Sequence, residues 1–550
     1  MKKINAKRIE ELAIRLTEQL SVTETKGEVK IAEEIYDILK DLNYFKDNPN
    51  HLSFIPLPDD PLGRKSVLAI LKGKEESKDT LILIGHLDTV GISDYGSLKD
   101  YAHKPNELME SFMAIKDKLP QDVRIDLESG DYLFGRGIFD MKAGLAINIA
   151  ILEELAKDID NLRGNIVFAF LCDEENNSSG MLSLLPQLVR LQEEEGFEYL
   201  ALLDTDYMTN EYEGDENKYI YLGTVGKLMP SFYIVGKETH VGEAFGGIDA
   251  NQISSAILKR INLNTEFCDQ LDGETSLPPI SLRQRDLKAE YSVQTAKANI
   301  LFFNYSTLCS TPDQVLEKMK RAALEAFQEV IHNLNQQYKN FCRLSGREYK
   351  ELSFKTRVLT YDELYRAVKA EIGDELDEKI EELTAKILRD DTIDQRDFSL
   401  KLVEEVHKLW SDREPVVIVY FSPPYYPHIA VEGKREKEKR LIKAVDQAIG
   451  RIKTDYRLVK RKFFPYISDL SYGAAPREEE SIEALKNNMP GFGTKYRLPL
   501  EEMQKLDLPV VDIGPFGKDA HKFTERLHKD YSFRVVPELV LRTIMELLAK

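Results

Sequence analysis

The stretch from Ile166 to Gly180, IVFAFLCDEENNSSG, joins seven consecutive apolar residues to three adjacent acids. A continuous apolar run of this length is typical of a strand that is buried on both faces, as in a parallel sheet. Asp173, Glu174 and Glu175 then place like charges together at the end of that strand. This is unfavourable unless a positive group lies nearby. The stretch therefore predicts a parallel sheet with a cationic partner at its carboxyl edge.

Helix and strand patterns alternate along the first part of the chain. Helices are expected near residues 9–20, 28–42, 144–157 and 181–195, and strands near residues 66–73, 79–90, 166–171 and 199–206. Repeated strand–helix units imply an α/β fold with a mostly parallel sheet and helices on both faces. Such sheets bind ligands beyond the carboxyl ends of their strands.

The pattern changes after Asp206 to antiparallel strands, a helix near residues 249–263 and a strand near residues 299–307. A charged, helix-rich insertion follows over about 312–413, and the strand–helix alternation then resumes. The predicted organisation is a catalytic domain formed by residues 1–214 and 426–550. A smaller α+β domain, residues 215–425, interrupts it and contains the helical insertion.

Composition excludes several classes of protein. The net charge of −19 over 550 residues argues against a nucleic-acid or anionic-membrane partner, because both need a basic face. No apolar stretch reaches the roughly 20 residues of a membrane span, and the N-terminus resembles an amphipathic helix more than a secretory signal. Four scattered cysteines suggest neither a disulfide framework nor a thiolate zinc site. The expected location is the cytoplasm.

Acids and histidines recur where the predicted strands end. His86 and Asp88 in LILIGHLDTV are two residues apart, so both point the same way in an extended chain. A neutral imidazole is a good zinc ligand, and a nearby carboxylate commonly fixes its orientation. Further candidates follow the other strands or precede a helix: Asp140, Glu174, Glu175, Asp204, Asp206 and His521.

Taken singly, each of these residues has an ordinary structural explanation, such as a helix N-cap or a solvated turn. Their joint recurrence at one edge of the sheet is what predicts a metal site. Five groups are more than one tetrahedral zinc requires, and they suit two cations that share a bridging carboxylate. The five expected ligands are His86, Asp140, Glu175, Asp204 and His521.

Five motifs carry a family resemblance: GHLDTV, GRGIFDMKAG, DEENNSSGM, GKETHVGEAFGGIDA and GPFGKDAHKFTERL. In this order they resemble the signatures of the co-catalytic dizinc exopeptidases. This is the peptidase M-twenty family of aminoacylases, glutamate carboxypeptidases and succinyl-diaminopimelate desuccinylase. The chain length, the helical insertion and FFPYISDLSYG look most like the arginine-utilisation, RocB-type branch.

The resemblance implies a role for each site residue. Asp140 would bridge two Zn²⁺ ions, His86 and Asp204 would complete one site, and Glu175 and His521 would complete the other. Asp88 would stand behind His86 and Glu174 would be the general base. The smaller domain would be a lid, whose His240 would polarise the scissile carbonyl. The Asp140–Met141 peptide bond is expected to be cis.

The sequence also departs from the family pattern. Asp204 stands where many relatives have Glu followed by Pro, so Asp206 is an alternative ligand. FFNYST lacks the arginine that relatives place on the corresponding strand. Ser471 stands where relatives often have a second arginine, in a Ser-Asp-x-Arg segment. Substrate preference therefore cannot be transferred from well-known relatives. Carboxylate and imidazole ligands also accept Co²⁺ or Mn²⁺.

The leading hypothesis is a zinc-dependent hydrolase that cleaves an amide bond of a small N-acyl amino acid or short peptide, with a link to arginine catabolism that rests on the resemblance. The alternatives are a catalytically silent metal-binding assembly protein, which uses the helical insertion to bind partners, and a dimetal phosphoesterase. The oligomeric state stays open between a homodimer that pairs near residues 250–263 and a monomer in which the insertion replaces the partner.

Overall fold

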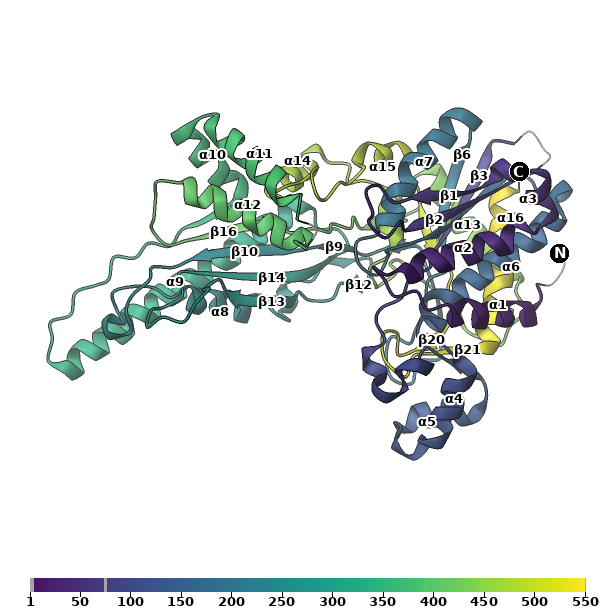
Figure 1. Ribbon diagram of the computed structural model, residues 1–550, viewed down its shortest axis with the longest axis horizontal. Helices are drawn as coiled ribbons and strands as arrows, with labels where there is room; N and C mark the ends of the chain where they lie inside the picture. Colours follow the sequence, from purple (N-terminus) through teal and green to yellow (C-terminus); the bar gives the residue numbers. More distant parts are fainter. Residues whose placement is uncertain (1–3, 74–76, 391, 550) are drawn as a thin grey trace. The chain divides into compact units, whose positions relative to one another are not determined.

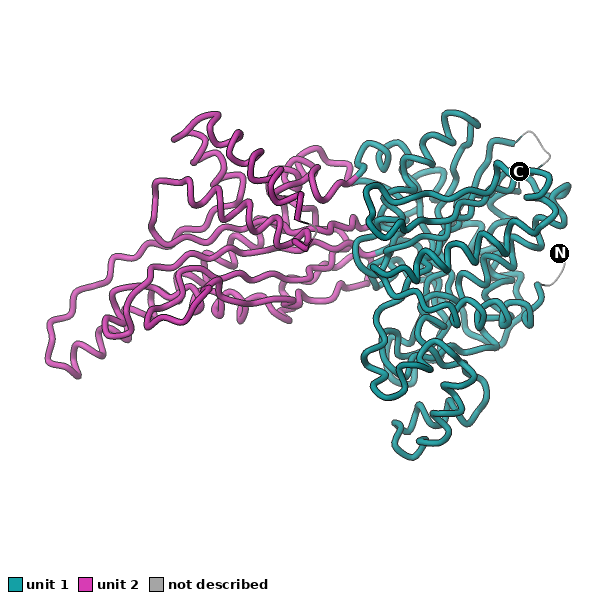
Figure 2. The backbone as a smooth tube through the Cα atoms, in the orientation of Figure 1, with its two compact units in different colours: residues 1–224, 429–475, 499–550 teal, residues 225–428, 476–498 magenta. Residues whose placement is uncertain are grey.

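The computed structural model describes residues 4–73, 77–390 and 392–549. Residues 1–3, 74–76 and 550 of the predicted catalytic domain and residue 391 of the predicted insertion lie outside these ranges. The chain forms two compact units (Figure 2). Unit 1 comprises residues 1–224, 429–475 and 499–550, and unit 2 comprises residues 225–428 and 476–498.

Unit 1 is built on an eight-stranded mixed sheet (Figure 1). In spatial order its strands are β1 (Leu52–Pro56), β2 (Lys65–Lys72), β5 (Asn165–Leu171), β3 (Asp79–His86), β6 (Glu198–Asp204), β19 (Val510–Asp512), β7 (Lys218–Tyr221) and β18 (Leu458–Arg461). The central strands β5, β3, β6 and β19 run parallel to one another. β1 and β2 extend the sheet in antiparallel pairings.

Helices cover both faces of this sheet, which confirms the predicted fold class. All residues of β5 are buried, and alternate side chains of a strand point to opposite faces. Ile166, Phe168 and Phe170 join the core that α6 (Ala143–Lys157) completes. In Figure 1, α7 (Ser179–Glu195) lies on the other side of the strands. Other helices of the unit are α1 (Ala6–Glu18), α2 (Lys26–Lys40), α3 (Asn43–Asp47), α13 (Glu436–Arg451), α15 (Leu500–Leu506) and α16 (Val536–Leu548).

A helical excursion between β3 and β4 (Tyr132–Phe134) was not anticipated from the sequence. It contains α4 (Pro105–Ala114) and α5 (Gln121–Ser129) and has a small core of its own. β4 pairs with β21 (Arg526–His528), which pairs with β20 (Gly517–Lys518). The buried Arg526 donates hydrogen bonds to Asp122 (2.8 Å) and Asp126 (2.6 Å) of α5. The excursion is thereby attached to the segment that carries His521.

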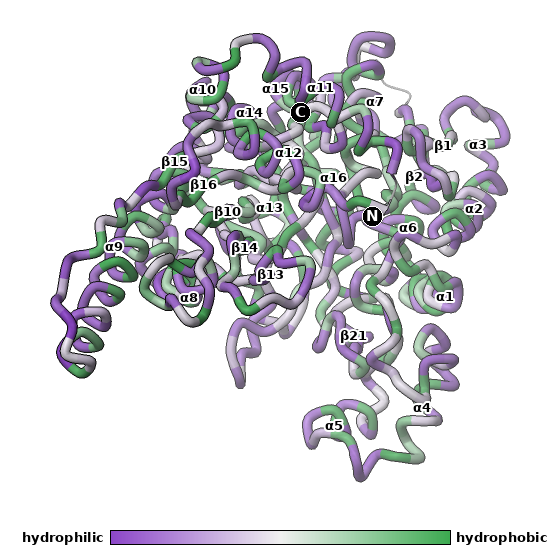
Figure 3. Tube along the Cα trace, turned by 60° about the vertical axis from the view of Figure 1, so that its left-hand side comes forward, coloured by the Kyte–Doolittle hydropathy of each residue, from purple (hydrophilic) through white to green (hydrophobic). Residues whose placement is uncertain are grey.

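Unit 2 is an α+β unit. Its sheet has the order β13 (Ile280–Asp286), β14 (Ala298–Thr307), β10 (Pro230–Val235), β16 (Val416–Phe421) and β15 (Val358–Thr360), and β9 (Gly226–Leu228) pairs with β14. Its helices are α8 (Ala250–Ile261), α9 (Pro312–Ser345), α10 (Tyr361–Ile372), α11 (Glu375–Ile387), α12 (Gln395–Leu409) and α14 (Glu479–Asn488). Hydrophilic and hydrophobic residues alternate along α9, as expected of a helix with one buried face (Figure 3).

The boundaries of the two units differ from the predicted domain boundaries, which give the second domain residues 215–425. β7, expected at the start of the second domain, pairs with β18 and β19 in the sheet of unit 1. Residues 476–498 belong to unit 2, where α14 packs against α9. Both segments are short and have little pattern of their own, so only long-range pairing decides their place. Among the described residues, no helix is both long and apolar enough to span a membrane.

Candidate metal centre

Three neighbouring parallel strands deliver site residues to one edge of the sheet of unit 1. His86 is the last residue of β3 and pairs with Leu171, the last residue of β5. The acidic triplet begins two residues after Leu171, and Asp204 ends β6 beside Ile84. The register of the sheet therefore places the ends of three separate segments next to one another.

Asp140 reaches this edge from the turn that precedes α6. The peptide bond between Asp140 and Met141 is cis, as the resemblance implies. Gly137, three residues earlier, has a φ of +80°, and a side chain there would meet Thr89 at 2.4 Å. Glycine at this position lets the turn pass close to the segment after β3.

The carboxylate of Asp140 lies between two imidazoles. Its Oδ1 is 3.0 Å from Nε2 of His86, and its Oδ2 is 3.0 Å from Nε2 of His521. The same Nε2 of His521 is 3.1 Å from Oε2 of Glu175. Ligand atoms of His86, Asp140 and Glu175 all lie within 4.8 Å of one another. The structure thus brings together four of the five predicted ligands.

Asp88 stands behind His86 and also holds the acidic triplet. Nδ1 of His86 is 3.1 Å from the main-chain oxygen of Asp88 and 3.6 Å from its Oδ1. The two carboxylate oxygens of Asp88 accept the N–H groups of Glu174 and Glu175, each at 3.1 Å. One buried carboxylate therefore orients the imidazole and the turn that bears the proposed base and ligand.

Asp204 and Asp206 lie outside the 4.8 Å group. Asp204 accepts the Ser468 hydroxyl at 3.2 Å and the N–H of Thr205 at 2.8 Å. Oδ1 of Asp206 accepts the N–H of Tyr207 at 2.7 Å. Both side chains are buried. These contacts do not distinguish the two carboxylates as ligands, so both stay candidates for the fifth ligand.

Acidic side chains outnumber basic ones at this edge of the sheet, and their pKa values are shifted accordingly. Burial raises the pKa of Asp204 to about 7 and holds the pKa of Glu174 and of Asp206 well above the usual carboxyl range. Burial lowers the pKa of His521, but contacts with Asp140 and Glu175 outweigh it and raise that pKa to about 11. Positive charge at this edge is therefore strongly favoured.

The donor set fits divalent cations. It consists of imidazole nitrogens and carboxylate oxygens, which are the ligands that Zn²⁺, Co²⁺ and Mn²⁺ accept. Oε1 of Glu175 is buried and has no hydrogen-bond partner among the described residues. A buried carboxylate oxygen without a partner is costly, and a bound cation would satisfy it.

Asp173, the first acid of the triplet, faces away from this group. Its Oδ1 accepts a hydrogen bond from Arg64 at 2.7 Å, and its N–H donates to the buried Glu28 at 2.9 Å. A protein cation thus compensates this acid. Sequence reasoning missed Arg64 and Glu28, because they precede the triplet by more than 100 residues and no local pattern marks either of them.

The comparisons identify the family. A family model described as Peptidase family M20/M25/M40 matches residues 115–475. The chain belongs to this family. In Bacillus subtilis (strain 168), the uncharacterized protein YqjN is 37% identical over 540 residues, which cover 98% of this chain and 96% of YqjN. Protein RocB of the same strain is 35% identical over 545 residues, with 99% and 95% covered. The predicted resemblance is confirmed.

Two solved structures share the fold. A tripeptidase from Staphylococcus aureus superposes with a TM-score of 0.52 at 14% identity, covering all of both chains. The YXEP protein of Bacillus subtilis, a dinuclear metal-binding peptidase of the M20 family, has a TM-score of 0.50 at 13% identity, with 99% and 98% covered. Membership of the M20 family supports a metallohydrolase.

The M20 motif histidine His240 belongs to unit 2. It is exposed, and its Nδ1 accepts the N–H of Gly242 at 3.1 Å. The segment that follows is fixed within the unit, because the ring of Phe245 packs in a tilted arrangement against Tyr338 and Phe341 of α9, with centroids 5.0 and 5.3 Å away. The helix-rich tract therefore supports the segment that presents His240.

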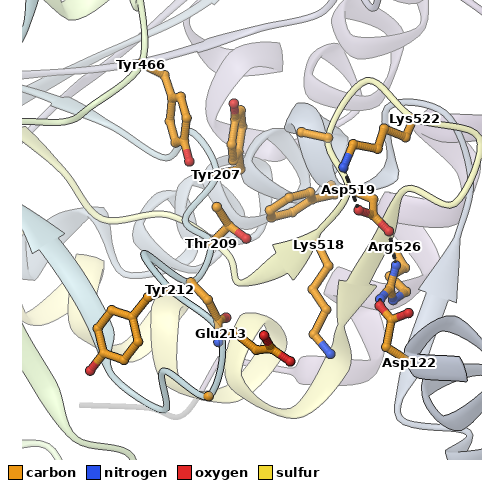
Figure 4. A pocket seen from close by; sticks show the side chains of 14 residues that line it. Asp122, Tyr207, Thr209, Tyr212, Glu213, Tyr466, Lys518, Asp519, Lys522 and Arg526 are labelled. Carbon is orange, nitrogen blue, oxygen red and sulfur yellow. Dashed lines mark hydrogen bonds and ion pairs between the residues drawn. The ribbon is translucent and has the colours of Figure 1, made fainter. Parts of the chain in front are cut away.

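A cavity of about 490 Å³ in unit 1 is lined by chain neighbours of the candidate ligands (Figure 4). Phe139 and Tyr207 form an aromatic wall with ring centroids 4.9 Å apart, and Tyr466 continues it, 5.0 Å from Tyr207. Lys522, which also lines the cavity, has its ammonium 3.1 Å from Asp519. The cavity has the size of a small-molecule site.

Proposed function

We propose that this member of the M20 family is a dinuclear metal-dependent hydrolase that cleaves an amide bond of a small substrate derived from an amino acid. The observation that carries the proposal is the position of Asp140, whose two carboxylate oxygens each lie 3.0 Å from a different imidazole. A carboxylate between two nitrogen donors is the arrangement that a bridging ligand requires.

In the proposed centre, Asp140 would be shared by two cations, of which Zn²⁺ is the first choice. His86 and Asp204 would hold one of them, with Asp206 as the alternative to Asp204. Glu175 and His521 would hold the other. Cations bound there would polarise the substrate carbonyl and make a water acidic near neutral pH.

Glu174 is the proposed general base. Its neighbour Glu175 points to His521, and the N–H groups of both are held by Asp88. Burial, followed by the repulsion of nearby acids, raises the pKa of Glu174 well above the usual value, although His86 opposes the rise. A carboxylate with a raised pKa can take a proton from water and return it to the leaving nitrogen.

The substrate is proposed to be a short peptide or an N-acyl amino acid. The cavity beside Phe139 and Tyr207 is large enough for such a group but not for a folded protein. His240 of unit 2 is proposed to donate a hydrogen bond to the carbonyl oxygen as negative charge develops on it. A place in arginine catabolism and a cytoplasmic location belong to the same proposal.

The test combines metal content with a substrate panel. Purified protein is analysed for Zn, Co and Mn per chain and then assayed on N-acyl amino acids and dipeptides, including arginine derivatives. About two metal ions per chain with cleavage of a panel member would support the proposal. A chain that binds no metal even after reloading would overturn it.

A further inference from the structure

We propose that the buried ion pair between Arg136 and Glu525 is a positioning device that holds the bridging carboxylate and the His521 segment in register. The pair thereby controls binding of the second cation, the one served by Glu175 and His521. This inference rests on the proposed function. Neither residue has been given a role so far, and neither is a candidate ligand.

Glu525 holds the turn that carries Asp140. Its Oε1 accepts three main-chain N–H groups, from Gly137 at 2.8 Å, Phe139 at 3.3 Å and Asp140 at 3.3 Å. Its Oε2 accepts Nη1 of Arg136 at 2.8 Å. A single carboxylate thus gathers the main chain on both sides of Phe139, directly before the bridging ligand.

Arg136 extends the connection to two other segments. Its Nη2 donates to the main-chain oxygen of His521 at 3.4 Å and to Asp94 at 2.8 Å, and its Nε donates to Gly91 at 3.1 Å. The guanidinium therefore links the segment after β3, the Asp140 turn and the segment that bears His521. Its planar, multiply donating shape suits such a junction.

Burial makes this arrangement expensive, which argues for a specific role. Arg136 is 2% exposed and Glu525 is 1% exposed. An ion pair removed from water contributes little to stability, and a hydrophobic pair of similar volume often does as well. What an apolar pair cannot do is accept three N–H groups on one side and donate to a carbonyl oxygen on the other. The contacts favour geometry as the reason for the pair.

The contacts also predict which cation depends on the pair. No recorded contact joins Arg136 or Glu525 to His86 or Asp204, whereas the main chain of His521 is held directly. The first cation would keep His86 and Asp204, and the shared Asp140 alone would be loosened. For the second cation, both Asp140 and His521 would no longer be held in position. Weakening should therefore be unequal between the two binding steps.

The test is a titration of the metal-free full chain with Co²⁺. Binding is monitored by calorimetry and by the visible absorption of bound Co²⁺. Wild type is compared with Glu525→Gln and Arg136→Lys, which keep size or charge. The matched control is Glu153→Gln in α6, which removes a buried carboxylate that pairs with the partly exposed Arg8 (2.7 Å) and touches none of the site segments. Thermal unfolding of each metal-free variant verifies that it folds.

Removal of a group that orients metal ligands typically costs about 10–100-fold in metal affinity. We expect that loss in the second binding step of Glu525→Gln and Arg136→Lys, a smaller change in the first, an altered Co²⁺ spectrum, and both steps unchanged in Glu153→Gln. If both site variants bind Co²⁺ with wild-type affinity in both steps, this inference alone is overturned. The same holds if the control variant loses as much Co²⁺ affinity as the site variants. A wild-type chain that binds no Co²⁺ would overturn the proposed function and the inference with it.

Discussion

Replacement of Arg64 should lower the stability of the fold without removing any candidate metal ligand. It is 9% exposed, and its guanidinium contacts Asp173 at 2.7 Å, Glu28 at 3.2 Å and Asp60 at 2.9 Å. Glu28 and Asp173 have fully buried side chains. Arg64→Met keeps much of the volume but leaves these carboxylates without their cation. Removing one partner of a buried pair costs about 3–5 kcal/mol.

The assay is thermal unfolding in the presence of a chelator, because bound metal would add stability of its own. For a cooperative unit of several hundred residues, 1 kcal/mol shifts Tm by about 1–2 °C, so we expect a loss of about 3–10 °C. Lys72→Met is the control. Lys72 pairs with Glu195 at 2.7 Å with both side chains partly exposed, and such surface pairs contribute about 0–1 kcal/mol.

Two further measurements test the reasoning. The triple variant Arg64→Met, Glu28→Gln, Asp173→Asn should recover most of the loss, because no unpaired charge remains. The penalty should also shrink as the pH is lowered from 8 to 5. Burial raises the pKa of Glu28 to about 8 and raises that of Asp173, and without Arg64 both would rise further. An acid with a raised folded pKa destabilises the fold at pH values above its unfolded pKa, and this effect disappears once the acid is protonated in the unfolded state as well. A loss equal to that of Lys72→Met would refute the argument.

Three further predictions follow from single groups. Glu174→Gln should retain both metal ions but lose about 10²–10⁴-fold in hydrolysis rate; wild-type turnover in the metal-loaded variant would contradict its role as base. Burial lowers the pKa of His407 from 6.5 to about 4. Between these pH values the unfolded chain binds more protons than the folded chain, so the free energy of unfolding decreases as the pH is lowered, by up to about 3 kcal/mol. Denaturant unfolding at pH 7 and 4.5 should show this loss, and His407→Phe should abolish it. Mixed His240→Ala and Glu174→Ala chains should stay inactive if each chain completes its own site; recovered activity would show sharing across a dimer.

The parts that sequence reasoning predicted are those that local pattern determines. An unbroken apolar run identified β5 as a strand buried on both faces, and the glycines around Asp140 marked a turn before a helix. Because parallel strands deliver their carboxyl ends to one edge, His86, Glu175 and Asp140 were expected together without any knowledge of the register. Whether Asp204 or Asp206 completes the set was left open, since both follow the same strand.

The parts that it missed depend on partners far apart in the chain. Arg136 and Glu525 are separated by 389 positions and appear in the sequence as ordinary members of GRG and TERL. The helical excursion that holds α4 and α5 has no strong periodicity to mark it, and its attachment runs through Arg526. Hydrogen bonds of this kind are specified by three-dimensional proximity alone.

The acidic triplet illustrates how adjacent residues can be given opposite tasks. Asp173 has a φ of +66°, so the chain turns sharply there and its carboxylate meets Arg64. Glu174 and Glu175 continue past the turn, and Asp88 fixes their N–H groups. One acid is thus paired with an arginine, whereas Glu174 and Glu175 belong to the candidate metal centre, where Glu175 contacts the imidazole of His521. An arginine that reached all three would stabilise the fold and remove the negative charge that a metal centre needs. Confining Arg64 to the far side of the turn leaves that charge available for cations.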